Sequence, residues 1–181
     1  MNKRQGSGII IYNPELDAFV IQLRDIPPFG WAILGGYVKK NETPDQAAER
    51  ELKEELQNIV FDRQNLQYFK SYDERPDGFV QHIYEYLTSQ RFEPYEGLPV
   101  LVCGEGADMN LVTRTQILQA RLKSERDILD NLYDSIPNHL KNSKVMRAFT
   151  RYLVKRIYTP EPLTLLWNCK KIFNDYFVKE H

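Results

Sequence analysis

Three glutamates lie close together in the stretch between residues 44 and 57. Glu51, Glu54 and Glu55 are three and four positions apart, so a helix would place them on one face. Like charges on one helix face repel each other by roughly 0.2–0.5 kcal/mol per pair. Clustered carboxylate oxygens suit a hard cation such as magnesium, which keeps several waters and bridges to the phosphates of a substrate. The spacing therefore indicates a divalent-metal site for phosphate chemistry.

The neighbouring residues predict the helix that would present these acids. Thr43 is an expected N-cap, and Pro44 is tolerated in the first turn of a helix. An apolar stripe recurs every four residues, at Ala48, Leu52 and Leu56. We expect this helix to run from about 44 to 57, after a short polar loop that follows Gly35-Gly36.

The stretch from Gly35 to Asn58 resembles the signature of the Nudix (MutT-like) hydrolases. That signature reads Gly, five residues, Glu, seven residues, Arg-Glu, an aliphatic residue, any residue, Glu-Glu, any residue, Gly and an aliphatic residue. The matching positions are Gly36, Glu42, Arg50, Glu51, Leu52, Glu54 and Glu55. Gln57 stands in place of the family's glycine, and Asn58 in place of its aliphatic residue. Since Asn58 tolerates a left-handed C-cap better than Gln57, we expect the helix to be capped at Asn58.

This resemblance implies an α/β fold, a Nudix-type α/β/α sandwich with a mixed sheet and a C-terminal helical extension. It also implies an enzyme that cuts a diphosphate bond in a nucleoside diphosphate linked to another group. Mg²⁺ or Mn²⁺ would activate the attacking water and offset the phosphate charge. The resemblance gives Gly36, Glu51, Glu54 and Glu55 as metal ligands, and Glu51, Glu54 and Arg50 as catalytic residues. Which glutamate acts as base is left open.

Four more residues complete the expected site. Glu42 would pair with Arg50 and fix the loop onto the helix, as structural support. Many family members use a later acid as an extra ligand or base; we expect Glu105, because its two neighbouring glycines let the chain approach a metal closely. Glu85 remains the alternative. Arg24 is a candidate for binding a substrate phosphate.

Alternating and periodic patterns predict the remaining elements. Strands are expected at 8–12, 18–23, 31–34, 65–71, 79–87, 100–103 and 109–112. Helical segments are expected from residue 115 onward, from Pro137 to about 157, and from about 163 to 177. We expect a Nudix domain over 1–157 and a helical extension over 158–181.

Composition favours one compact domain. The chain has 181 residues, of which 42% are hydrophobic, and a formal net charge of −1. Cys103 and Cys169 form neither a disulfide framework nor a metal spacing, so we expect two buried thiols in a reducing compartment. No signal peptide and no apolar stretch of membrane-spanning length is present, so we expect a cytoplasmic protein without a membrane partner.

Charge is concentrated near the C-terminus. Residues 138–181 hold nine Lys and Arg against three acids. In the helix after Pro137, one face is expected to be apolar, with Met146, Phe149, Leu153 and Ile157. The other face is expected to be basic, with Lys141, Lys144, Arg147, Arg151 and Lys155. This basic stripe is either a solvated helix face or an electrostatic footprint for RNA.

Two other functions remain open beside the hydrolase. One is a nucleotide-sensing regulator with a Nudix fold, and the other is an enzyme that processes RNA ends with the help of the basic helix. The expected partner is a small-molecule nucleotide, such as a nucleoside triphosphate or a nucleotide sugar. Nucleic acid is a less favoured partner, and a homodimer is an open alternative.

Overall fold

The computed structural model describes residues 4–73, 77–90, 106–123, 127–159 and 162–179. The chain forms two compact units: unit 1 is Met1–Val20 with Ile33–Glu105, and unit 2 is Ile21–Ala32 with Gly106–His181. Strand β2 (Ala18–Leu23) contributes residues to both units. The expected domain boundary after residue 157 stays a prediction.

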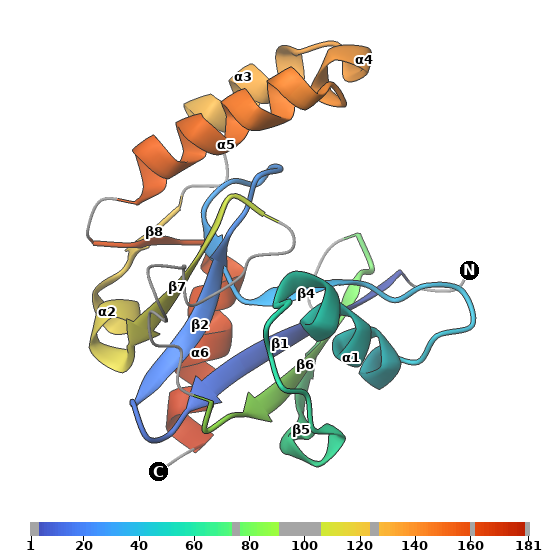
Figure 1. The fold of residues 1–181 in the computed structure, drawn as a ribbon, viewed down its shortest axis with the longest axis vertical. Coiled ribbons are helices and arrows are strands. Elements are labelled where there is room, and N and C mark those ends of the chain that lie inside the picture. The colour runs from blue at the N-terminus through green and yellow to red at the C-terminus, as the bar shows by residue number, and fades with distance from the viewer. Residues whose placement is uncertain (1–3, 74–76, 91–105, 124–126, 160–161, 180–181) are drawn as a thin grey trace. The chain divides into compact units, whose positions relative to one another are not determined.

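Unit 1 is a mixed sheet that carries one long helix (Figure 1). Besides its part of β2, its elements are β1 (Gln5–Asn13), β4 (Leu34–Tyr37), α1 (Pro44–Glu55), the short 3-10 helix η1 (Arg63–Asn65), β5 (Leu66–Tyr72) and β6 (Val80–Leu87). Strand β1 pairs in parallel with β6 and antiparallel with β4 and β2, and β5 pairs antiparallel with β6. The predicted α/β class with a mixed sheet is confirmed.

Helix α1 packs on one face of this sheet. Because side chains alternate along a strand, Ser7, Ile9 and Ile11 of β1 share a face. The Ser7 hydroxyl donates to the carbonyl of Pro44 in the first turn of α1 over 2.5 Å, so this face carries the helix. Ile9 and Ile11 are fully buried there. The predicted apolar stripe is confirmed, since its members are fully buried: Ala48, Leu52 and Leu56.

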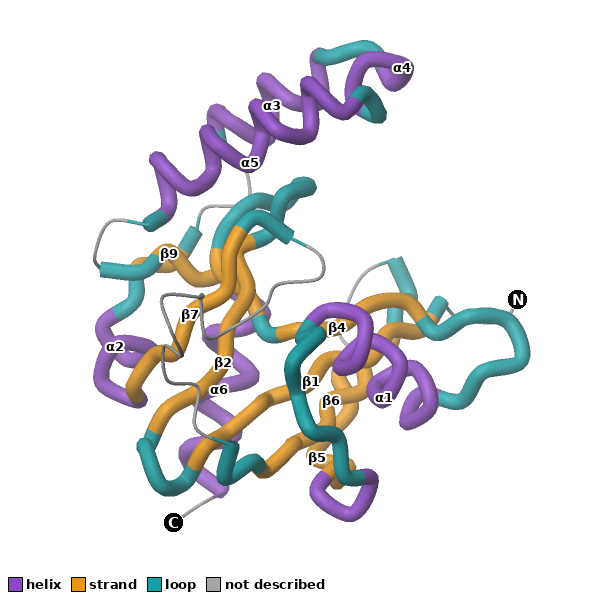
Figure 2. The backbone as a smooth tube through the Cα atoms, in the orientation of Figure 1, coloured by secondary structure: helices purple, strands orange, loops and turns teal. Residues whose placement is uncertain are grey.

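Unit 2 combines short strands with most of the helices (Figure 2). Besides its part of β2, its elements are β3 (Trp31–Ala32), β7 (Asp108–Thr113), α2 (Arg114–Gln119), β8 (Arg121–Leu122), α3 (Ile128–Ser135), α4 (Asn138–Lys141), α5 (Lys144–Tyr158), β9 (Thr164–Leu165) and α6 (Trp167–Lys179). Strand β3 pairs antiparallel with β2 and parallel with β9, which pairs in parallel with β8. The predicted C-terminal helix is confirmed as α6, whereas the predicted strand at 100–103 lies outside the described residues.

Helices α3 and α5 form an antiparallel hairpin, side by side in Figure 2. Asp127 caps α3 by accepting from the backbone N–H of Leu129, and its other oxygen accepts from the Tyr158 hydroxyl at the end of α5 over 2.7 Å. Burial, the first cause, and the bond to Asp127 raise the pKa of Tyr158. The Tyr158 carbonyl accepts from the indole N–H of Trp31 over 2.7 Å, which ties β3 to the hairpin.

A buried ion pair holds the loop before β3 against α3. Lys123 Nζ lies 2.6 Å from Asp130 Oδ2, and the other Asp130 oxygen accepts from the Phe29 backbone N–H over 2.9 Å. Lys123 also donates to the Phe29 carbonyl. Because a buried charge without a partner is costly, these contacts fix the loop tightly.

Two expectations for the helix after Pro137 are wrong. The helix is interrupted, because Ser143 accepts from the backbone N–H of Met146 and so begins α5 as a separate helix. The apolar face is also rotated: Phe149 and Ile157 are 54% and 49% exposed. The buried positions of α5 are instead Thr150, Val154 and Tyr158.

Cys169 is buried, as expected, and Cys103 lies outside the described residues. Within the described ranges, none of the helices has the length and apolar character needed to cross a membrane.

Candidate active site and metal centre

The start of α1 is fixed by a capping box. Thr43 Oγ1 accepts from the backbone N–H of Gln46 over 3.4 Å, and the Gln46 side chain accepts from the Thr43 N–H over 2.9 Å. Pro44 occupies the first turn, where a missing N–H costs nothing. The predicted cap and first turn are therefore confirmed, and they set the rotation of the acidic face from the N-terminal end.

The other end of α1 differs from the prediction. The helix ends at Glu55, with Leu56 as C-cap at φ −111°, and the Leu56 N–H donates to the Leu52 carbonyl over 3.0 Å. Among the described residues, the non-glycine residues with positive φ are Asp17 and Asn41. Asn58 is therefore not a left-handed cap. The helix stops without one: Leu56 leaves the helical conformation, and the Ile59 N–H closes a turn on the Leu56 carbonyl over 3.3 Å.

Two glycines of β4 let the acids of α1 approach the sheet. A Cβ on Gly36 would lie 2.3 Å from Glu51 Oε1, so a side chain there would displace that carboxylate from its place against the strand. Gly35 has φ +145°, and its N–H donates to Glu55 Oε2 over 2.9 Å. Glu51 and Glu55 are buried, with 8% and 5% of their surface exposed. Helix and strand thus bring two carboxylates and the Gly36 backbone together.

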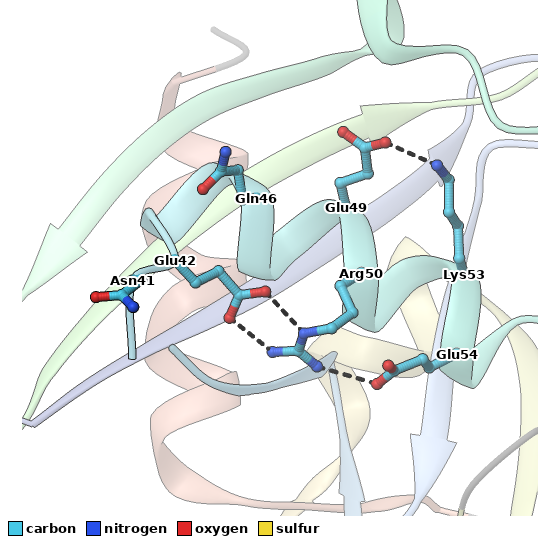
Figure 3. Close-up of a pocket in the computed structure, with 7 residues that line it drawn as sticks. All are labelled: Asn41, Glu42, Gln46, Glu49, Arg50, Lys53 and Glu54. Atoms are coloured by element: carbon cyan, nitrogen blue, oxygen red, sulfur yellow. Dashed lines mark hydrogen bonds and ion pairs between the residues drawn. The ribbon is translucent and has the colours of Figure 1, made fainter. Parts of the chain in front are cut away.

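Arg50 connects the acids to the loop before the helix (Figure 3). Its Nε and Nη2 hold the two oxygens of Glu42 at 2.8 and 3.0 Å. Its Nη1 donates to Glu51 Oε1 over 2.5 Å and to Glu54 Oε2 over 3.0 Å, and Nη2 also donates to the Tyr37 carbonyl over 3.0 Å. The predicted pairing of Glu42 with Arg50 is present.

The same contacts shift the titration of both partners. Hydrogen bonds from Arg50, and then from the Lys39 N–H, lower the pKa of Glu42 to about 2. The bond to Glu42, followed by those to Glu51 and Glu54, raises the pKa of Arg50 against the opposing effect of burial. Glu42 therefore stays ionised in acid and anchors the loop.

Glu54 is the most open of the three helix acids. Its side chain is 45% exposed, and Lys39 Nζ approaches its Oε1 at 3.8 Å. An open depression of about 720 Å³ lies beside it, along the outer side of α1. The lining residues are Asn41, Glu42, Gln46, Glu49, Arg50, Lys53 and Glu54. The depression touches Glu54 but not Glu51 or Glu55, so it marks access to the acidic face from solvent and not the centre of that face.

The donor set suits a hard divalent cation. Glu51, Glu54 and Glu55 offer only carboxylate oxygens, and the Glu51 carboxylate lies directly over the Cα of Gly36. Within the described part of the chain, no three acids, histidines or cysteines already converge on one point. The reason is visible in the contacts: Arg50 holds Glu51 and Glu54, and Gly35 holds Glu55.

The other sequence candidates are placed separately. Arg24 belongs to unit 2, where its guanidinium donates to the carbonyls of Pro28 and Pro27 at 2.9 and 3.3 Å. Glu105 lies outside the described residues. Glu85 pairs in register with Ile10, so it points to the face of the sheet opposite α1.

Three contributors to the site were not foreseen from the sequence: the Gly35 N–H, the Tyr37 carbonyl and Lys39. Two of them are backbone groups, which no residue type reveals. The adjacent glycines were the available signal, since one of them adopts a positive φ that other residues avoid.

The fold and the site together define a Nudix domain. It is a mixed sheet in which β4, with Gly35-Gly36, lies beside a helix that carries the Arg and Glu residues of the Nudix signature. A model of the NUDIX domain matches residues 2–132, and the chain belongs to the Nudix hydrolase family. No curated protein sequence matches the chain.

The chain is also similar to several solved structures. A MutT/nudix family protein from Enterococcus faecalis is 25% identical, with a TM-score of 0.50, over 61% of this chain and 44% of that one. A bifunctional NMN adenylyltransferase/ADP ribose pyrophosphatase from Francisella tularensis is 21% identical, with a TM-score of 0.47, over 62% of this chain and 34% of that one. A NUDIX family hydrolase from Clostridium perfringens is 16% identical, with a TM-score of 0.48, over 84% of this chain and 99% of that one. The chain thus spans less than half the length of the first two.

Proposed function

We propose that the protein is a divalent-metal-dependent hydrolase that cleaves a diphosphate bond in a nucleoside diphosphate linked to another group. The observation that carries this proposal is the acidic face of α1. Glu51 and Glu55 are buried against the Gly35-Gly36 strand, and Glu54 is open to solvent beside them. With Glu42, the three acids carry four negative charges against the two positive charges of Arg50 and Lys39, and this excess favours a bound cation.

Mg²⁺ or Mn²⁺ would be held by Glu51, Glu54 and Glu55, with the Gly36 carbonyl as a further ligand. A bound divalent ion lowers the pKa of water and offsets the negative charge of the diphosphate. Gly36 admits Glu51 to the strand, because any side chain there would collide with the carboxylate. Glu54, the exposed acid, is the group best placed to meet a proton from solvent.

Arg50 and Glu42 position the acids. Arg50 orients Glu51 and Glu54 through one nitrogen, while its other two nitrogens stay on Glu42 and the Tyr37 carbonyl. The loop before α1 is thereby fixed to the helix that carries the ligands. Substrates of this class include nucleoside triphosphates and nucleotide sugars.

The deciding experiment is hydrolysis of a panel of nucleoside diphosphate derivatives with Mg²⁺ or Mn²⁺, comparing the wild type with Glu54→Gln. We expect the substitution to lower kcat by at least roughly 100-fold, the scale of one acid–base or metal-ligating group. Glu15→Gln, in the exposed turn after β1, is the matched control and should retain full activity.

Two results would contradict the proposal. Turnover that survives in Glu54→Gln and does not need a divalent ion would place the chemistry elsewhere. Tight binding of a nucleotide without turnover by the wild type would instead indicate a nucleotide-sensing regulator.

A further inference from the structure

Helix α5 presents apolar side chains on two opposite sides. Thr150, Val154 and Tyr158 form its buried side. Three apolar residues on the other side remain open and follow each other at helical spacing, with exposures of 80%, 54% and 56%: Val145, Phe149 and Tyr152. The buried side of α5 already supplies its packing surface in unit 2, so folding does not require the three exposed apolar residues on the other side.

The cations of α5 form a stripe beside these residues. From 144 to 158 the helix contains five cations and no acid. Four of them recur every three or four residues and are exposed; we call Lys144, Arg147, Arg151 and Lys155 the cation stripe. Arg151 and Lys155 meet Asp25 and Asp108 at 2.8 and 3.4 Å. Lys144 and Arg147 form no ion pair with any other residue that the structure describes.

The fifth cation extends the aromatic side. The guanidinium of Arg156 lies 5.5 Å from the centre of the Tyr152 ring, in a cation–π contact. Tyr152 and Phe149 therefore offer two exposed rings, one of them in contact with an arginine, on a side of the helix that meets the cation stripe at Lys155, three residues after Tyr152. Exposed rings with cations nearby are a surface on which unpaired bases stack.

The spacing of the cation stripe suits a linear polyanion. Three or four residues advance a helix by about 4.5–6 Å. One strand of B-form DNA carries a phosphate about every 3.4 Å, and a strand that is pulled out of its stack carries them further apart. A lipid surface needs no such register, and a duplex keeps its bases in its own stack.

We propose that α5 binds a single-stranded nucleic acid, with phosphates along the cation stripe and bases stacked on Phe149 and Tyr152. This site is separate from the acidic face of α1, and the proposal does not depend on the hydrolase activity. DNA and RNA share the required chemistry, and the test includes both.

The test is fluorescence anisotropy with labelled 12-nucleotide oligothymidine and oligouridine, and with a duplex of the same length. With phosphate contacts at Lys144 and Arg147, the two stripe cations without an ion pair among the described residues, we expect affinity for the single strands to fall by at least roughly 7-fold between about 50 and 200 mM salt. At equal salt, the single strands should bind more tightly than the duplex. If one of the two labelled strands binds more tightly, it shows whether α5 prefers the DNA or the RNA strand.

Substitutions separate the contribution of base stacking from that of phosphate binding. Tyr152→Ala and Phe149→Ala should each weaken binding by roughly 5- to 150-fold, the scale of one base–aromatic stack, without changing the salt slope. Arg147→Ala should reduce the slope by about 0.7. Tyr68→Ala, an exposed tyrosine of β5, and Arg121→Ala, an exposed cation of β8, are matched controls and should bind like the wild type. Circular dichroism checks that each variant is folded.

Several outcomes would overturn the proposal. Equal binding of duplex and single strand, or wild-type affinity in Tyr152→Ala and Phe149→Ala, would exclude stacking. Absence of binding at low salt would exclude the site. Sedimentation with vesicles containing phosphatidylglycerol, but no binding of oligonucleotide, would assign the face to a lipid surface. Loss of diphosphate hydrolysis affects none of these readouts.

Discussion

Arg50 holds two of the three glutamates that we expect to bind metal. A single nitrogen, Nη1, donates to both Glu51 and Glu54, at 2.5 and 3.0 Å. A divalent cation that takes these same two oxygens as ligands would have to weaken both ion pairs. Arg50 can release them and keep its place, because its other nitrogens remain on Glu42 and the Tyr37 carbonyl.

We therefore expect Arg50→Gln to bind Mn²⁺ more tightly than the wild type, while its kcat falls. Two ion pairs of about 0.2–1 kcal/mol each correspond to roughly 2- to 30-fold in affinity. Electron paramagnetic resonance of free Mn²⁺ measures this directly. Arg63→Gln is the control, since Arg63 pairs with Asp45 and Glu49, which are not among the proposed metal ligands. Weaker Mn²⁺ binding in Arg50→Gln would show that the arginine gathers the ligands and does not compete for them.

The ion pair of Glu42 with Arg50 should make the stability of the protein depend on pH in the acid range. Arg50 lowers its pKa from 4.5 to about 2 in the folded protein, so the ionised form is favoured by folding. The stability this contributes is complete above the unfolded pKa of about 4.5 and is lost as the pH falls toward 2. Glu42→Gln should therefore be less stable than the wild type near neutral pH, and the difference should shrink between about pH 4.5 and 2.

Urea unfolding at a series of pH values measures that difference. Glu15→Gln, in an exposed turn, shows the effect of removing a carboxylate outside the site. If the difference in unfolding free energy between the wild type and Glu42→Gln stays constant down to pH 2, the negative charge of Glu42 adds no stability through its ion pair with Arg50.

At the scale of elements, the capping box of α1 connects stability to the site. Thr43→Ala removes a side-chain cap and should cost about 1 kcal/mol of stability. Because α1 carries the acids, Mn²⁺ affinity should fall as well. Thr113 caps α2 in the same way, with Gln116 as its partner, so Thr113→Ala is a matched control.

Thermal unfolding and Mn²⁺ titration of both variants test this prediction. Thr113→Ala should lose comparable stability and keep its Mn²⁺ affinity. Equal loss of affinity in the two variants would mean that general destabilisation, and not the position of α1, controls metal binding.

Sequence patterns predicted α1 well because several signals agree there. The N-cap, the proline and an apolar stripe of Ala48, Leu52 and Leu56 all specify one helix with one buried side. Helix α5 lacks that agreement. It has apolar residues on two sides, and the more hydrophobic Phe149 is exposed while Thr150 is buried. A prediction from hydrophobicity alone therefore assigned the wrong face of α5 to the core.

Tertiary partners explain the other differences. Strands β8 and β9 have two residues each, too few to show a pattern, and they exist because they pair beside β3. In the site, residue types predicted the acids and the pairing of Glu42 with Arg50. The backbone partners at Gly35 and Tyr37 depend on how β4 lies against α1, which no local pattern encodes.

For the whole molecule, metal should stabilise one region and leave the rest unchanged. A ligand that binds only the folded state raises stability by mass action. Hydrogen exchange with saturating Mn²⁺ should therefore show slower exchange in β4 and α1. Exchange in the α3–α5 hairpin of unit 2 should change little, because none of the proposed ligands comes from unit 2.

Removal of the metal with a chelator should reverse the protection. Glu54→Gln should show little protection at the same Mn²⁺ concentration. Protection that appears first in unit 2, or that survives in Glu54→Gln, would place the ion outside the acidic face.

The position of the glutamates along α1 has one more consequence. Glu51, Glu54 and Glu55 occupy the last turns of a helix that ends at Glu55. The aligned peptide dipoles give that end a partial negative charge. An acid there therefore lowers helix stability by about 0.3–1 kcal/mol, whereas a cation there would raise it. A bound divalent ion is thus a counter-charge for the helix as well as for the substrate. Without it, the negative charge at this end of α1 is offset by Arg50 and by the Gly35 N–H, while burial of Leu52 and Leu56 keeps the last turn in place.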